Sequence, residues 1–310
     1  SFRPIRESAI RQTSLFSMGL DVADINRDGH FDLFVADMLS PEHLDRHVQV
    51  MDGMAFAQYR STATPRPQSP RNTLLLNQGD GDFSEIARLA GIDASYWSWC
   101  PVFLDVDLDG YEDLLVTTGH GRDAQNADIS REVDHLIKSQ SLSPSKQLAT
   151  RERFPLLQPP NVAFRNGGNL RFEEKSQDWG FDSTRITHGM VLVDLDQDGD
   201  QDLVATCLND PPLILRNDSI KPRLRIRLRG SEPNSMGIGA KITVTSPGLP
   251  EQIQEIVSGG RYLSSDEPSR VFAMSQKSDL ATIHVRWPDG TSTKVSDIPA
   301  NQLVEVRPDP

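Results

Sequence analysis

The chain has 310 residues, of which 37% are hydrophobic and 25% are charged, and its formal net charge is −12. This composition is that of a globular protein with room for one large or two moderate domains, and it excludes an intrinsically disordered chain. The acidic balance argues against nucleic acid binding, and no apolar stretch approaches the length of about 18 residues that a membrane helix needs. We therefore expect a protein that neither binds nucleic acid nor inserts into a membrane.

A nine-residue acidic phrase occurs three times, at residues 24–32 (loop 1), 105–113 (loop 2) and 194–202 (loop 3). Each copy has Asp or Asn at positions 1, 3, 5 and 9 and Gly at position 6. Oxygens at these positions, a carbonyl at position 7 and the turn at Gly can surround Ca²⁺, which takes about six to eight oxygen ligands. Solvated turns are the alternative, because Asp, Asn and Gly are common turn residues, but three copies in register favour calcium.

The three loops thus predict up to three Ca²⁺ sites. Position 7 would offer its backbone carbonyl, and the other positions would offer side chains. The candidate metal ligands are Asp24, Asn26, Asp28, His30 and Asp32 in loop 1, Asp105, Asp107, Asp109, Tyr111 and Asp113 in loop 2, and Asp194, Asp196, Asp198, Asp200 and Asp202 in loop 3.

Other metal motifs fit these loops less well. An EF-hand closes with Glu at position 12, where this chain has Val35, Val116 and Ala205. Zinc prefers His and Cys, which the loops lack apart from His30 at the backbone-donor position. Short apolar runs precede and follow each loop, so we expect each loop to join two buried β-strands.

Most of the acidity of the chain belongs to the three loops. Their side-chain ligand positions carry eleven carboxylates, close to the excess of acidic over basic residues. Three calcium ions would reduce the net charge to about −6. The acidity is therefore local, and metal binding explains it.

A second phrase follows each loop, at residues 72–85, 161–174 and 212–217. These segments read as a strand, an Asn/Gly turn and a strand, which predicts a β-hairpin. Each repeat is then expected to have four strands, one before the loop, one after it and two in the hairpin, as in a blade of a β-propeller. Trp97 and Trp179 mark the places where one repeat gives way to the next.

Insertions lengthen the repeats, whose loops begin 81 and then 89 residues apart. Residues 40–57 predict a short amphipathic helix, residues 62–71 a Pro-rich loop, and residues 121–160 a second insertion with a helix near 129–138. Such insertions often make the contacts of a domain. His43 and His47 have a spacing that can hold zinc, but no third ligand is evident, so a solvated helix face is the default.

From Lys221 onward, alternating polar and apolar residues predict a small antiparallel sandwich or barrel of about 90 residues. We therefore divide the chain into calcium-binding blades at residues 1–220, with blades at about 15–90, 91–181 and 182–220, and a β-domain at residues 221–310. Cys100 and Cys207 could form a disulfide, but buried free thiols are favoured. No Ser or Cys nucleophile with an ordered base is evident, so no catalytic residue is assigned.

The three loops with their Asn-x-Leu-x-x-Asn hairpins resemble the FG-GAP/VCBS repeats of integrin-like propellers. The tail resembles the ASPIC/UnbV module through Asn234-Ser-Met-Gly237-Ile-Gly239, Gly259-Gly260-Arg-Tyr262-Leu-Ser264 and Val285-Arg-Trp287-Pro-Asp-Gly290. The pair is typical of secreted proteins similar to cartilage acidic protein, including many bacterial ones. Ser265 and the phrase Phe272-Ala-Met-Ser depart from that pattern, which puts side-chain-specific roles of the tail in doubt but not its fold.

The resemblance implies an all-β fold, with a partial FG-GAP-type propeller of about three blades and a C-terminal β-sandwich or barrel. Propellers of this family close with about seven blades. We therefore expect an upstream segment or another chain to complete the ring, since an incomplete propeller exposes strand edges and apolar faces.

The function implied is that of an extracellular or otherwise extracytoplasmic calcium-binding module, without catalysis of its own. It would mediate adhesion or complex assembly with a protein or polysaccharide partner at the cell surface or matrix. The alternative is an enzyme, for instance a carbohydrate-active one, or an accessory subunit of an enzyme, that uses the propeller face.

Overall fold

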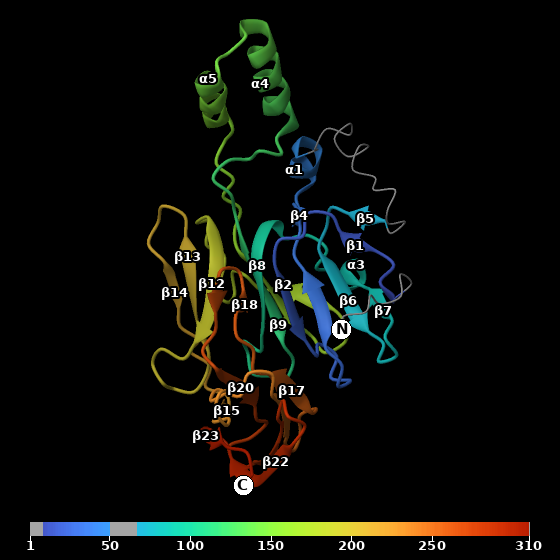
Figure 1. Cartoon of the computed structure of the whole chain (residues 1–310), viewed down its shortest axis with the longest axis vertical. Coiled ribbons are helices and arrows are strands. Elements are labelled where there is room, and N and C mark those ends of the chain that lie inside the picture. The colour runs from blue at the N-terminus through green and yellow to red at the C-terminus, as the bar shows by residue number, and fades with distance from the viewer. Residues whose placement is uncertain (1–8, 50–66, 310) are drawn as a thin grey trace.

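The computed structural model describes residues 9–49 and 67–309 of the chain. Most of its regular elements are β-strands, arranged in three neighbouring sheets above a C-terminal pair of sheets (Figure 1). This arrangement confirms the all-β fold class. None of the helices in the described ranges is long and apolar enough to cross a membrane.

Two of the neighbouring sheets contain the four antiparallel strands expected of a blade. Blade 1 consists of β2 (Leu20–Ala23), β3 (Asp32–Val35), β6 (Thr73–Asn77) and β7 (Phe83–Glu85), and loop 1 joins β2 to β3. Blade 2 consists of β8 (Tyr96–Leu104), β9 (Asp113–Thr118), β10 (Val162–Asn166) and β11 (Phe172–Glu174), and β4 (Met38–Leu39) pairs with the free side of β8.

Blade 3 has three strands, so the expectation of four strands in every repeat is wrong here. Its strands are β12 (Thr187–Val193), β13 (Asp202–Cys207) and β14 (Leu213–Leu215). After Asn217 the chain lacks the glycines that turn the hairpins of blades 1 and 2, and Pro222 leads directly into β15 (Arg223–Leu228). The chain therefore enters the C-terminal domain instead of returning along β14.

The blades pack face to face through two apolar cores. Between blades 1 and 2, Phe34, Leu74 and Leu114 are fully buried, and the rings of Phe34 and Phe103 meet edge to face with centroids 6.3 Å apart. A second core, which includes Met190, lies between blades 2 and 3. Burying each of these large side chains stabilises the fold by about 1.5–3 kcal/mol.

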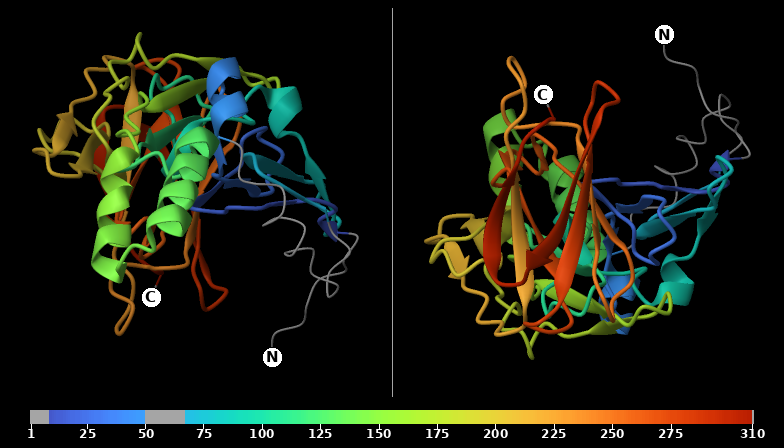
Figure 2. Two further views of the ribbon diagram at one scale, coloured as in Figure 1. Left: turned by 90° about the horizontal axis from the view of Figure 1, so that it is seen from above. Right: turned by 90° about the horizontal axis from the view of Figure 1, so that it is seen from below.

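The C-terminal domain is a sandwich of two sheets around its own core (Figure 2). One sheet has the order β20 (Ser269–Ala273), β15 and β23 (Gln302–Val306). The other has the order β17 (Gln252–Glu255), β16 (Lys241–Thr245), β21 (Leu280–Arg286) and β22 (Ser292–Pro299). The domain departs from the expected antiparallel pattern at β15 and β23, which are parallel because the chain crosses between the sheets after β22.

The described part of the insertions is helical. Helix α1 (His43–Val48) contains His43 and His47, both exposed, whereas residues 50–57 of the predicted helix and 62–66 of the predicted loop lie outside the described residues. Residues 67–71 include β5 (Gln68–Ser69), which pairs in parallel with β1 (Thr13–Ser14). Other short elements around the blades are α3 (Ala87–Ala90), η2 (Thr150–Arg153) and the hairpin of β18 (Gly260–Arg261) and β19 (Ser264–Ser265).

Helices α4 (Ala127–Gln140) and α5 (Pro144–Ala149) lie side by side at the end of the molecule opposite the C-terminal domain (Figures 1 and 2). The predicted helix near 129–138 lies within α4. Asn126 caps it, because its Oδ1 accepts the N–H of Ile129 at 3.1 Å.

The β18–β19 hairpin connects the C-terminal domain to the first strand of every blade. Arg261 pairs with Asp21 of β2 at 2.6 Å, the N–H of Tyr262 points to Cys100 Sγ of β8 at 3.5 Å, and Ser264 Oγ donates to the carbonyl of Met190 in β12 at 3.1 Å. Cys100 and Cys207 are both free; Cys100 is buried, as predicted, and Cys207 is half-buried.

Candidate metal sites

Each acidic loop folds around the carboxylate of its first residue. In loop 2, Asp105 Oδ1 accepts the N–H of Asp109 at 2.9 Å and its Oδ2 accepts the N–H of Gly110 at 2.8 Å, while Asp109 Oδ1 accepts the N–H of Tyr111 at 3.0 Å. Loop 1 repeats all three bonds, and loop 3 repeats the second and third. Glycine is needed at position 6 because its φ is +87°, +95° and +98° in the three loops.

The last aspartate of each loop ties it to the following hairpin. Asp113 Oδ2 accepts the N–H of Val106 at 2.9 Å, and its Oδ1 accepts the N–H of Asn166 at 2.8 Å. Asp32 and Asp202 make the same pair of bonds in loops 1 and 3. Position 9 is therefore already engaged by two backbone donors, and it holds each blade together independently of any metal.

The hairpin asparagines also join neighbouring loops. Asn166 Nδ2 donates to the carbonyl of Ile25 in loop 1 at 2.9 Å, and Asn217 Nδ2 donates to the carbonyl of Val106 in loop 2 at 3.1 Å. In both cases the acceptor is the residue at position 2 of the preceding loop. The sequence identifies these asparagines only as turn residues. Their recurrence at the same place in each repeat was the one sign that they also join neighbouring loops.

Position 7 was expected to offer a backbone carbonyl, and its side chain turns out to pack. The Tyr111 ring lies against Gly168 so closely that a Cβ there would be 2.8 Å from the ring, and His30 lies in the same way against Gly79. In loop 3 the residue at this position is Asp200, which is buried and lies 3.4 Å from the Arg223 guanidinium.

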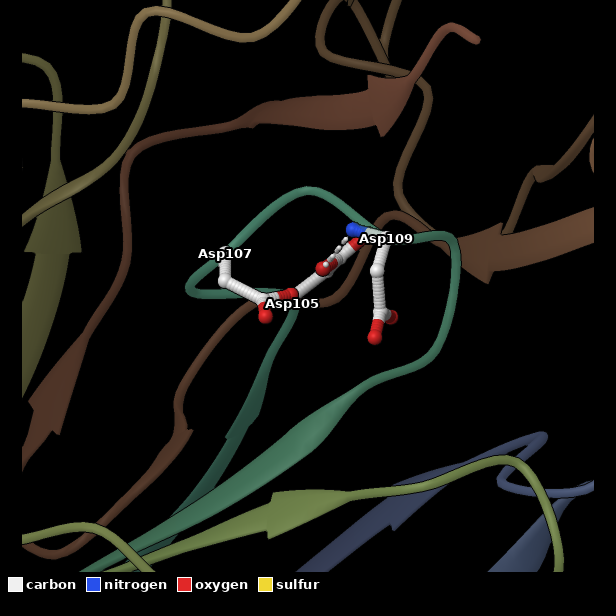
Figure 3. Close-up of side chains that lie close together, drawn as sticks. All are labelled: Asp105, Asp107 and Asp109. Atoms are coloured by element: carbon white, nitrogen blue, oxygen red, sulfur yellow. Dashed lines mark hydrogen bonds between the residues drawn. The ribbon is translucent and has the colours of Figure 1, made fainter.

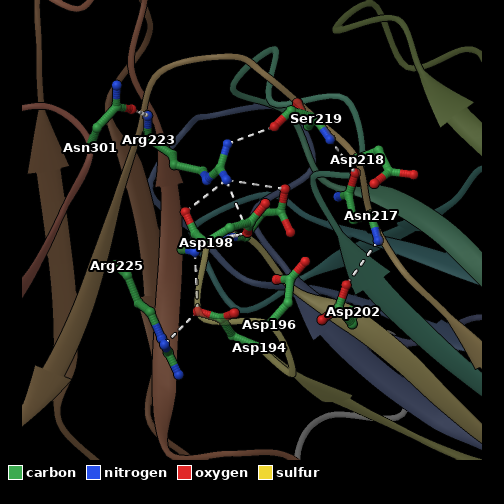
Figure 4. Close-up of polar contacts among 12 residues, drawn as sticks. Asp194, Asp196, Asp198, Asp202, Asn217, Asp218, Ser219, Arg223, Arg225 and Asn301 are labelled. Atoms are coloured by element: carbon green, nitrogen blue, oxygen red, sulfur yellow. Dashed lines mark hydrogen bonds and ion pairs between the residues drawn. The ribbon is translucent and has the colours of Figure 1, made fainter.

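Two of the three loops bring three carboxylates close enough together that they could share a metal ion. Ligand oxygens of Asp105, Asp107 and Asp109 lie within 4.8 Å of one another in loop 2 (Figure 3). Those of Asp194, Asp196 and Asp202 do so in loop 3 (Figure 4). Among the described residues, the candidates outside these two clusters are Asp24, Asn26, Asp28, His30, Asp32, Tyr111, Asp113, Asp198 and Asp200.

Arginine side chains approach the clustered carboxylates. Arg165 pairs with Asp107 at 2.7 Å and with Asp109, and Arg225 pairs with Asp194 at 2.5 Å. The acidic motifs alone do not indicate these arginine partners. The available signs were an arginine directly before the hairpin asparagine of repeats 2 and 3, and the alternating arginines of β15.

Burial perturbs the loop carboxylates strongly. It raises the pKa of Asp105 to about 8, with the nearby charge of Asp109 adding to the effect and the Gly110 N–H opposing it. Burial likewise raises the pKa of Asp32 to about 7 and that of Asp200 to about 7. Such values mean that burial disfavours the charged form of these carboxylates by more than their hydrogen bonds and arginines compensate, and a cation at the loops would offset that cost.

Several buried oxygens at candidate ligand positions accept no hydrogen bond from the described residues. They are Asn26 Oδ1 in loop 1, Asp107 Oδ1 in loop 2, and Asp194 Oδ1 with both carboxylate oxygens of Asp200 in loop 3. Buried polar atoms normally have a partner, so these atoms are available to a ligand. Because every side-chain donor is an oxygen, with a carboxylate majority, the residues present fit a hard cation such as Ca²⁺.

Several acids at other than the candidate ligand positions face a cavity of about 150 Å³ between the blades and the C-terminal domain and are ion-paired. Glu112 pairs with Arg27 at 2.8 Å, and Asp21 pairs with Arg261. These pairs cross from one blade to the next or between blade and C-terminal domain, which indicates a role in assembly of the fold.

A cluster of aromatic and histidine rings lies beside the β18–β19 hairpin. His120 stacks on Trp97 with ring centroids 4.3 Å apart, and His188 meets Trp99 at 4.3 Å and Tyr262 at 6.3 Å. Burial lowers the pKa of His188, and the nearby His120 lowers it further, which favours the neutral form of this imidazole.

Comparison with protein families agrees with this architecture. A model described as "FG-GAP-like repeat" matches residues 62–116, and a model described as "ASPIC and UnbV" matches residues 230–310. No curated protein matches the chain. Both matches are to repeat or interaction modules, which indicates a structural or interaction role. The chain therefore combines FG-GAP-like repeat sequence with a C-terminal ASPIC and UnbV domain, as its motifs predicted.

Proposed function

We propose that this protein is an extracytoplasmic calcium-binding module that mediates adhesion or complex assembly and has no catalysis of its own. The observation that carries the proposal is the pairing of clustered carboxylates with buried, unpartnered oxygens in the acidic loops. Loops of this kind in extracellular modules bind Ca²⁺ with a Kd on the order of 10⁻⁴–10⁻³ M, which suits calcium-rich surroundings and not the cytosol.

Calcium would act on the fold through the loop residues. When bound, it would supply positive charge where the clustered carboxylates of loops 2 and 3 converge. Asp105 orients the turn by accepting the N–H groups of Asp109 and Gly110, and Asp113 transmits that order to the hairpin through Asn166. Binding to the folded state alone stabilises it by RT ln(1 + [L]/Kd), which is about 2.7 kcal/mol per site at a hundredfold excess over Kd.

Isothermal calorimetry with Ca²⁺ tests this proposal directly. The wild-type chain should bind up to three equivalents, and Asp107→Asn and Asp196→Asn should each lose one. Asp182→Asn is the matched control, because Asp182 is exposed and lies outside the loops. Absence of calcium binding at millimolar concentrations, or equal stoichiometry in all four proteins, would refute the assignment.

We further propose that blades from an upstream segment or from another chain cover the two outermost faces of the three blades, which are the outer face of blade 1 and the far face of blade 3. On the outer face of blade 1, Leu20 and Val22 are 48% and 44% exposed beside the half-buried Leu33 and Val35. On the far face of blade 3, Ile214 is 62% exposed. Apolar faces of this kind are unusual on an isolated soluble domain and typical of interaction surfaces.

The helical insertion is the proposed contact with a protein or polysaccharide partner at the cell surface or matrix. It projects away from the blades, and Leu148 and Leu156 are exposed on it. Its two ends meet, since His120 and Leu157 exchange backbone hydrogen bonds at 2.8 and 3.1 Å and the N–H of Asp123 donates to Pro155. Replacing residues 124–154 by a short Gly-Ser linker therefore keeps the blade closed, and a partner found by pull-down should be lost from that variant. Retention of every partner would refute this role.

A carbohydrate-directed activity, or an accessory role in one, is the second candidate. The ring cluster of Trp97, Trp99, His120, His188 and Tyr262 favours it, because sugars stack on aromatic faces and histidine can transfer protons. Release of reducing sugars from polysaccharides by the wild type, and its loss in Trp99→Ala, would support this candidate over the first. Equal, background release from both proteins would reject it.

A further inference from the structure

The outer edge of β14 lacks the strand that its counterparts have. In blade 1 the third strand, β6, pairs with β7, and in blade 2 the third strand, β10, pairs with β11. In blade 3, β14 pairs with β13 on one side, and no strand of the described residues pairs with its other side. An unpaired strand edge presents backbone donors and acceptors to any extended segment that fits.

The three third strands share one register, so the missing pairing can be specified. Phe164 of β10 lies opposite Leu114, the residue after the last aspartate of loop 2, and Leu215 of β14 lies opposite Leu203, the residue after the last aspartate of loop 3. Asn166 and Asn217 then bond to those aspartates in the same way. Ile214 of β14 is thus the equivalent of Ala163 in β10, and by the same rule of Leu74 in β6.

The backbone of Leu74 and Ala163 faces the outer strand. The carbonyl of Leu74 accepts the N–H of Ile86 at 2.8 Å, and that of Ala163 accepts the N–H of Lys175 at 2.8 Å. Their own N–H groups are taken by Glu85 Oε1 at 3.4 Å and by Ser176 Oγ at 2.9 Å.

Ile214 has the same place in its blade but different surroundings. No residue of the described chain takes up the outward N–H and C=O that its register predicts. Its side chain lies on the face of the blade and is 62% exposed, whereas the side chains of Leu74 and Ala163 are buried against the next blade. The edge of β14 therefore has the backbone geometry to pair with a further strand, and none of the described residues supplies that strand.

The existing outer strands indicate what the occupant must look like. Phe83 and Phe172 lie opposite the hairpin asparagines, and Glu85 and Glu174 lie opposite Leu75 and Phe164. Both strands have three residues and read Phe-x-Glu. The middle residue lies opposite Leu76 in blade 1 and opposite Arg165 in blade 2, where it is Glu173. Blade 3 has Arg216 at this place, which is 62% exposed and pairs with the exposed Asp218 at 2.7 Å. A Glu opposite Arg216 would add a further carboxylate partner, so charge complementarity favours Phe-Glu-Glu.

We propose that the edge of β14 binds an extended Phe-Glu-Glu segment of another polypeptide, which adds an antiparallel fourth strand to blade 3. Phe of the segment lies opposite Asn217, its first Glu opposite Arg216 and its second Glu opposite Leu215. The added strand is short, because Pro211 and Pro212 end the usable edge on one side. This strand addition is distinct from the covering of the blade faces proposed above, since it uses main-chain hydrogen bonds along an edge.

A peptide derived from the chain itself is a suitable probe. Residues 169–176, Asn-Leu-Arg-Phe-Glu-Glu-Lys-Ser, contain β11 and its flanks. A fluorescent form of this peptide should bind the full chain, measured by anisotropy, and the peptide with Phe172→Ala should bind at least about tenfold more weakly. Ile214→Pro should abolish binding, because it removes an edge N–H that β13 does not use. Ile220→Ala, a change at an exposed residue outside the strand, should leave binding unchanged.

A register-specific cross-link tests the proposal without the proline variant, which could lose binding by misfolding. In a Cys207→Ser background, Arg216→Cys should form a disulfide with the peptide that carries Cys in place of Glu173, its cross-strand neighbour, and not with a peptide that carries Cys in place of Asn169. No anisotropy change up to 1 mM peptide, equal binding of the Phe172→Ala peptide, or equal cross-linking of both peptides would overturn the proposal.

Discussion

Arg261 holds the C-terminal domain to the blades, and its replacement by alanine should destabilise the whole protein. Its side chain is 7% exposed and contacts Asp21 at 2.6 Å and Asp266 at 2.6 Å. Asp21 in turn accepts the N–H of Phe103 in blade 2 at 2.7 Å, and Asp266 accepts the N–H of Leu192 in blade 3 at 2.9 Å. One guanidinium therefore compensates two carboxylates that order all three blades.

The expected magnitude follows from the charges left behind. Breaking a buried ion pair by removing one partner costs about 3–5 kcal/mol, because the other charge stays buried without compensation. For a chain of this size each kcal/mol shifts the melting temperature by roughly 2 °C, so Arg261→Ala should melt about 6–10 °C below the wild type. Scanning calorimetry at saturating calcium measures this shift.

A surface pair in the same domain supplies the control. Arg229 is largely exposed and pairs with Glu305 at 2.8 Å, so Arg229→Ala should cost at most about 1 kcal/mol. Adding Asp21→Asn and Asp266→Asn to Arg261→Ala should recover part of the loss, because the triple variant no longer contains buried unpaired charge. An Arg261→Ala protein that melts within 2 °C of the wild type would refute the reasoning.

Two further predictions concern single positions. Gly168→Ala should lower the melting temperature several degrees more than Gly180→Ala. Both glycines have positive φ, at +72° and +65°, but only at Gly168 would the new Cβ meet the Tyr111 ring. Equal shifts of the two variants would show that the ring contact does not affect stability. In native protein at pH 8, a thiol reagent should modify Cys207 at least about tenfold faster than Cys100, because burial raises the pKa of the Cys100 thiol and blocks access to it. Mass spectrometry of the labelled peptides measures the ratio of the two rates. Equal rates would contradict the buried position of Cys100.

The sequence predicts those features of the loops that depend on neighbours along the chain. Asp105, Asp109 and Gly110 interact within six residues, so their spacing alone indicates a wrapped turn around one carboxylate. The strands on either side follow from their apolar runs in the same way. Local structure of this kind can be predicted from the sequence because the short stretch of backbone between the interacting groups fixes their relative positions.

Features that depend on tertiary contacts could not be predicted in this way. Arg225 lies 31 residues from Asp194, and Asn166 lies 141 residues from Ile25, so no local pattern connects either pair. The β18–β19 hairpin is visible as a family motif, yet nothing in its residues indicates that it docks on the first strand of every blade. Blade 3 has three strands because the chain enters the C-terminal domain after Asn217 instead of turning back along β14. The absence of glycines after Asn217 was a sign in the sequence that no hairpin forms there.

Thermal unfolding with and without calcium shows whether the acidic loops are calcium sites that stabilise the blades. We expect 10 mM Ca²⁺ to raise the melting temperature by several degrees to well above 10 °C relative to excess chelator, since three sites with Kd on the order of 10⁻⁴–10⁻³ M each contribute about 1.4–2.7 kcal/mol. The same concentration of Mg²⁺ should have a much smaller effect, because that ion demands a tighter octahedral site. An identical melting temperature in calcium and in chelator would contradict the claim that these acidic loops are calcium sites that stabilise the blades.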